Sequence, residues 1–110
     1  MTNKELCALL VQLNACEEAR LWLDTRNLAT AWQECERADW LLWLCGKMVG
    51  KEGWPSLKDV VLAACACAER ALRFVPKEED RPRLAIQVTR DWCAGLATEA
   101  DVAAAARAAA

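Results

Sequence analysis

Apolar residues recur at intervals of three and four along most of this chain, and that spacing constrains it to α-helices. Near the N-terminus, Leu6, Leu9, Leu10 and Leu13 fall at i, i+3, i+4 and i+7, on one face of a helix. No segment alternates apolar and polar residues as a half-buried strand does. A chain of 110 residues suffices for one domain. The sequence therefore predicts a single all-α domain over residues 1–110, a compact bundle of about five to seven helices.

Residues that cap or break helices divide the chain. Asn27 and Ser56 are favourable N-cap residues, and Asp59 completes a capping-box variant after Ser56. Pro82 suits the first turn of a helix, and Asn14 is where the first segment breaks if it forms two helices. The expected helical segments are 2–26, 27–45, 56–75, 82–95 and 98–110.

The stretch Val60–Ala68 contains nine apolar residues in a row. It is too long for a typical buried strand and is rich in alanine, which favours a helix. A helix that is apolar on nearly all sides is expected to be buried on nearly all sides. The segment therefore predicts the central helix of the bundle.

The same stretch is only about half as long as a membrane span requires. The N-terminus has the acidic residue Glu5 early and no small-residue cleavage site after its leucines, unlike a signal peptide. We therefore expect a cytoplasmic protein that has no membrane partner.

The alanine-rich C-terminal segment, residues 98–110, starts with Thr98 and Asp101 as a capping box. Only Val102 offers a large apolar anchor, so we expect this helix to be weakly docked.

Two similar strings, 16–19 and 65–68, each precede an apolar pair and a charged turn. They suggest a degenerate duplication of a helical hairpin, although alanine-rich hairpins also resemble one another without duplication.

Asp39 falls on an otherwise apolar stripe between Cys35 and Leu42 if the helix there is continuous. Burying a lone carboxylate is costly. Either Asp39 caps a new helix, which we favour, or it is buried and paired with Arg81 or Arg83 as a structural ion pair.

Composition disfavours several kinds of chemistry. The chain has no histidine, so Ser–His, Cys–His and His-ligated metal sites are excluded. Its seven cysteines lie mostly within apolar helical patterns, where a free thiol behaves as a small buried hydrophobe. The one close pair, Cys65 and Cys67, points to different sides of a helix and so does not suit zinc. We expect no catalytic residue, no metal and no cofactor, and therefore no enzyme.

Six tryptophans are many for a chain of this length. Trp54 lies in a glycine- and proline-containing loop and Trp40 near a helix start, so each is a candidate for partner contact as well as for packing. The other four tryptophans lie on apolar stripes and are expected in the core: Trp22, Trp32, Trp43 and Trp92.

A second group of candidates is basic. Arg70, Arg73 and Lys77 recur at helical spacing, with Arg81 and Arg83 nearby. Arg73, Lys77 and Arg81 could contact an acidic partner, but the interleaved acidic residues favour a solvated, salt-bridged face. The net charge of −2 also makes nucleic acid an unfavourable partner.

Three strings resemble a known family. They are Glu36–Leu44, Leu62–Ala68 and Glu79–Ile86, the last followed by Trp92 and Gly95. Together they resemble small bacterial and phage proteins that are grouped with the immunity partners of polymorphic toxins, over residues 15–110. The resemblance implies a helical protein with an alanine-rich tail and a protein partner, and it carries over no active site.

The function expected from these features is a non-enzymatic inhibitor that binds and neutralises a protein target by steric occlusion. Two settings fit: immunity against a toxin, or phage anti-defence, such as an anti-CRISPR-like inhibitor of a bacterial defence nuclease. The alternatives are a structural or oligomerisation module, for which a homodimer is one possible partner state, and a nucleic-acid-binding accessory protein.

Overall fold

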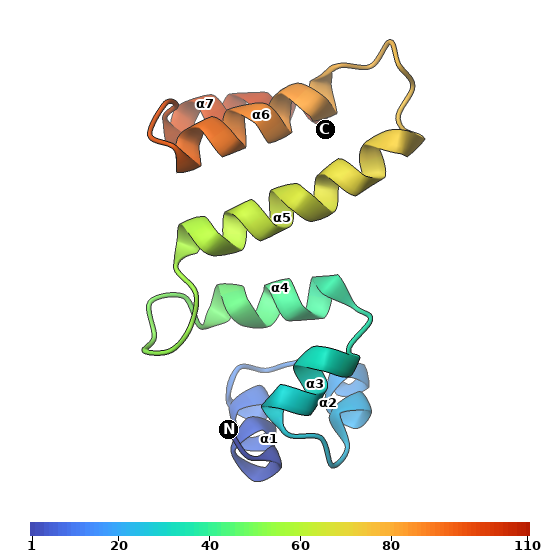
Figure 1. The fold of residues 1–110 in the computed structure, drawn as a ribbon, viewed down its shortest axis with the longest axis vertical. Coiled ribbons are helices and arrows are strands. Elements are labelled where there is room, and N and C mark those ends of the chain that lie inside the picture. The colour runs from blue at the N-terminus through green and yellow to red at the C-terminus, as the bar shows by residue number, and fades with distance from the viewer. The chain divides into compact units, whose positions relative to one another are not determined.

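The structure is a computed structural model that describes all residues, 1–110. It contains seven α-helices, one short 3-10 helix and no strand, which confirms the all-α prediction (Figure 1). The helices are α1 (Asn3–Gln12), α2 (Glu17–Leu23), α3 (Leu28–Glu34), α4 (Ala38–Lys47), α5 (Leu57–Ala71), η1 (Leu72–Phe74), α6 (Arg81–Cys93) and α7 (Glu99–Ala109). None of them combines the length and the apolar character that crossing a bilayer requires.

The contacts within the chain divide it into two compact units, which are described separately below. Unit 1 is Met1–Lys47, with α1 to α4, and unit 2 is Met48–Ala110, with α5, η1, α6 and α7. The expectation of one domain over the whole chain stays a prediction.

Unit 1 is built from four short helices around a small apolar core. Leu6 is its most deeply buried large side chain, at 2 % exposed, and Leu10, Leu23, Ala31 and Leu44 are also buried. The leucines of α1 recur at helical spacing, so the face that the sequence predicts is the face that packs.

The first helical segment breaks where Asn14 was expected to break it. Asn14 has a φ of 60°, in the left-handed region that asparagine tolerates better than most residues. α1 therefore ends before it and α2 begins after it, with Cys16 as the N-cap residue. The segment consequently folds as two helices rather than one.

The turn between α2 and α3 is fixed by α1. The Asn3 side-chain amide donates to the backbone carbonyl oxygens of Asp24 and Arg26, at 2.8 and 2.7 Å. Asp24 itself has a φ of 48°, a strained conformation for a residue other than glycine. These two bonds between distant parts of the sequence hold the turn in place.

Unit 2 is a row of three helices in which α6 packs against both α5 and α7. Figure 1 shows α7 running alongside α6 in the opposite direction. Arg90 of α6 forms an ion pair with Glu69 of α5, with 2.5 Å between Nε and Oε1. Gly95 adopts a φ of 80° after α6, which ends the helix and allows the reversal into α7.

The expectation that residues 60–68 are buried on nearly all sides is wrong. The segment is helical, as part of α5, but Cys65 is its only buried residue, and Leu62 is 37 % exposed. Its alanines are exposed. An apolar run predicts where a helix can be buried, but these small side chains meet too few neighbours to be covered.

The caps predicted from the sequence are present. Ser56 with Asp59, and Thr98 with Asp101, form complete capping boxes, and Asn27 accepts a hydrogen bond from the Thr30 backbone N–H. α7 is helical as expected and packs along α6, with none of its residues buried.

The internal duplication receives no support from local structure. Cys16 is the N-cap residue of the seven-residue helix α2, whereas Cys65 lies in the middle of the fifteen-residue helix α5. The two matched strings therefore occupy different positions in their helices.

Replacing Leu6 with alanine should destabilise unit 1 strongly. The change removes a nearly fully buried side chain, which costs about 2–5 kcal/mol in the free energy of unfolding. Leu21→Ala is the matched control, because Leu21 is 70 % exposed and its loss should cost no more than about 0.5 kcal/mol. Urea unfolding monitored by indole fluorescence measures both, and equal effects would show that Leu6 is not the centre of this core.

Candidate functional site

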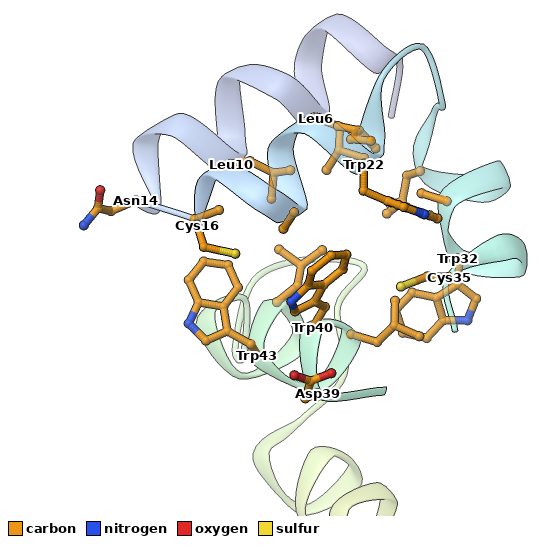
Figure 2. A pocket seen from close by; sticks show the side chains of 17 residues that line it. Leu6, Leu10, Asn14, Cys16, Trp22, Trp32, Cys35, Asp39, Trp40 and Trp43 are labelled. Carbon is orange, nitrogen blue, oxygen red and sulfur yellow. The ribbon is translucent and has the colours of Figure 1, made fainter. Parts of the chain in front are cut away.

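Unit 1 contains an apolar pocket of about 540 Å³, which lies among residues of α1, α2, α3 and α4 (Figure 2). Its volume is within the range of ligand-binding pockets, roughly 300–1,000 Å³. Leucines, alanines and four tryptophans form most of its wall. The pocket is therefore a site for an apolar group.

The four tryptophans come from three different helices. Trp22 belongs to α2, Trp32 to α3, and Trp40 and Trp43 to α4, where their spacing of three residues puts them on one face. The rings of Trp22 and Trp40 meet edge to face, with 6.3 Å between centroids. Figure 2 shows the indoles gathered around the pocket, with Asn14 pointing away.

Three of these indoles have a cation beside them. The guanidinium groups of Arg26 and Arg37 lie 4.3 and 4.4 Å from the ring centroids of Trp22 and Trp40. The ammonium of Lys47 lies 5.8 Å from the ring centroid of Trp43. A cation over an indole face is attracted by the ring's electron density, so these contacts help to hold the indoles in place.

Asp39 is the one charged side chain in the pocket lining. Its carboxylate accepts two hydrogen bonds from the Arg37 guanidinium, at 2.9 and 2.7 Å. The third guanidinium nitrogen of Arg37, Nη1, lies 3.8 Å from Glu18 Oε1, so this arginine links the start of α4 to α2. The hydrogen bonds from Arg37 lower the pKa of Asp39 below its ordinary value.

The two interpretations of Asp39 are both corrected by this arrangement. A new helix does begin here, as the cap interpretation requires, but Asp39 lies within its first turn and not at its N-cap position. The backbone N–H of Leu41 donates to the backbone oxygen of Arg37 and not to the Asp39 carboxylate. The alternative was a buried pair with Arg81 or Arg83, but each of these side chains has a local partner instead: Asp39 pairs with Arg37, Arg81 with Glu79 and Arg83 with Asp80. A carboxylate in a first turn is favoured by the helix dipole and needs no buried partner.

The basic candidates lie in unit 2, and two of them form local ion pairs. Arg81 pairs with Glu79 and lowers the pKa of that carboxyl to about 2, while Arg83 pairs with Asp80. Arg73 lies over the Phe74 ring, and Lys77 is exposed. None of them lines the pocket.

The burial of the tryptophans differs from the sequence prediction. Trp32 is 48 % and Trp43 38 % exposed, so their assignment to the core is wrong. Both have one side on the pocket and the other toward solvent. Of the two candidates for contact or packing, Trp40 is half-buried in the pocket wall, whereas Trp54 is half-buried in the loop before α5 and does not line the pocket.

The cysteines are all free, but only Cys45 and Cys65 are buried, fewer than their apolar surroundings suggested. Burial raises the pKa of both thiols. Cys16 and Cys35 line the pocket instead. No three potential metal-ligating side chains gather at any point in the structure.

Sequence reasoning did not predict the pocket, although one signal for it was present. Trp22 and Arg26, and likewise Trp43 and Lys47, are four residues apart on the sequence, the spacing at which helical side chains meet. These pairs indicate tryptophans that lie at a helix surface, beside a cation, rather than in a core.

Comparisons with known protein families, with curated proteins and with solved structures find no match for this chain.

Replacing Arg37 with glutamine should raise the pKa of Asp39 toward its ordinary value of 3.8, because the guanidinium hydrogen bonds that lower it are lost. Because the folded-state pKa is lowered, the pair stabilises the fold above about pH 4, and that contribution disappears as the pH falls through the folded-state value. NMR titration of the Asp39 carboxyl measures the shift. The control is Arg20→Gln, which removes an exposed arginine of α2 and should leave the pKa of Asp39 unchanged. An unchanged pKa of Asp39 in Arg37→Gln would refute the pairing.

Proposed function

We propose that this protein is a non-enzymatic binding protein that neutralises a protein target, and that the pocket of unit 1 receives an apolar side chain of that target. The observation that carries the proposal is the pocket itself, a cavity of about 540 Å³ with four tryptophans in its wall. Tryptophans in well-packed pockets are favoured anchor points of protein interfaces.

The exposure of the pocket wall supports a macromolecular partner. Trp32 and Trp43 each leave more than a third of their surface exposed while also lining the pocket. A partner that fills the cavity would cover these outer surfaces as well. A large aromatic surface of this kind is better satisfied by a protein segment than by a small polar metabolite.

The chemistry of the lining supports binding rather than catalysis. Its one carboxylate, Asp39, is paired with Arg37, and its pKa is lowered. A general acid or base that works near neutral pH needs a pKa close to that pH. The remaining lining residues are apolar, apart from Asn14 and the two thiols.

The resemblance to immunity proteins supports the setting. Immunity to a toxin and phage anti-defence can both be achieved by a small protein that occludes another protein without chemistry. In either case inhibition would come from steric occlusion of the target's working surface.

The test is capture of a target by wild-type protein and by a pocket variant in parallel. The double change Trp32→Ala and Trp43→Ala removes two half-exposed walls of the pocket, so it should abolish capture of a stoichiometric protein partner from host lysate. Leu96→Ala is the control, because Leu96 is 78 % exposed in unit 2, and it should capture as wild type does. Equal capture by the pocket variant would contradict the proposed site, and no stoichiometric partner with wild type would contradict the proposed function.

A further inference from the structure

We infer that the segment of the target that enters the pocket carries an arginine or lysine next to its apolar anchor, and that this cation replaces Arg37 on Asp39, Glu18 and the Trp40 ring. The inference rests on the proposed function, because it assigns the chemistry of the partner to the same pocket. It starts from what now surrounds the Arg37 guanidinium.

Arg37 occupies a site built from groups that bind a cation. Two oxygens of Asp39 accept hydrogen bonds from it, Glu18 lies at 3.8 Å, and the Trp40 ring lies beneath it at 4.4 Å. Two carboxylates and an indole face form a favourable environment for any guanidinium or ammonium group. Because Asp39 and Trp40 also line the pocket, a ligand in the cavity can reach the same groups.

The hold of this site on Arg37 is weak enough for exchange. The Arg37 side chain is 48 % exposed, and those of Asp39 and Glu18 are 64 % and 76 % exposed. Ion pairs between exposed side chains contribute little stability, because water competes with each partner. A ligand cation whose apolar neighbour is buried in the pocket would therefore displace Arg37 at small cost.

The charge around the pocket favours the same partner. Unit 1, whose helices form the pocket, carries seven acidic and five basic residues, a net charge of −2. Two of the three arginines, Arg26 and Arg37, already have an acidic partner and an indole beside them. The region is thus complementary to a basic segment and repels an acidic one.

The experiment uses the full chain and two tryptophan-free, helix-forming peptides as probes. One has leucines on one face and lysines and arginines on the other, and the second has glutamate at every basic position. Quenching or enhancement of the protein's indole fluorescence, checked by calorimetry, gives the affinities. We expect the basic peptide to bind at least about tenfold more tightly than the acidic one.

Removing Arg37 tests the exchange directly. Arg37→Gln frees Asp39, Glu18 and Trp40, so the basic peptide should bind it about fivefold more tightly than it binds Arg20→Gln, which has the same net charge. A second variant, Asp39→Asn, should weaken the basic peptide about fivefold relative to Glu99→Gln in unit 2. Thermal melts establish that each variant is folded.

The outcomes separate this inference from the proposed function. Tighter binding of the acidic peptide, or weaker binding of the basic peptide to Arg37→Gln, would overturn the cation exchange. The two peptides could also bind equally well, and both lose binding in the Trp32→Ala and Trp43→Ala variant. That result would overturn the cation exchange but would keep the pocket as the binding site. Binding of neither peptide would also overturn it, and the capture experiment would then decide the proposed function alone.

Discussion

The helices of unit 1 are too short to be stable alone, so packing around Leu6 is the interaction on which this unit depends. α2 and α3 have seven residues each, whereas isolated helices shorter than about 12–15 residues are marginal in water. Their order must come from burial of leucines against α1 and α4 and from the two hydrogen bonds of Asn3 to the turn between α2 and α3. The pocket is lined by residues of these four helices and of the turns that flank them, so the site exists only while that packing holds.

The same arrangement explains how large aromatic side chains tolerate partial exposure. Two half-buried indoles of the pocket are stabilised by a cation on the ring, Trp22 by Arg26 and Trp40 by Arg37. Arg37 in turn is oriented by Asp39 and Glu18. The polar groups around the pocket are therefore part of its framework, and they make its apolar wall compatible with the solvent-exposed face of the unit.

Periodicity and capping residues predicted the helices, because both signals are local. The break at Asn14 and the capping boxes at Ser56 and Thr98 depend on residues within a few positions of each other. Burial was predicted less well, since it depends on which faces meet: the apolar run of α5 is largely exposed, and Trp32 and Trp43 lie at the surface. Asn3, which is bonded to a turn more than twenty residues away, carries no local signal of that role.

An apolar pocket of about 540 Å³ in a unit of this size gives the side chains around it fewer packing contacts than a closed core would. The free energy of unfolding of unit 1 is therefore smaller than it would be if the same apolar residues packed against one another without a pocket. A ligand that binds the pocket only in the folded state raises the free energy of unfolding by RT ln(1 + [L]/Kd), where [L] is the concentration of free ligand. Under the proposed function, binding of the target would stabilise the folded state of this protein. The unbound protein would then be cleaved by proteases faster than the complex.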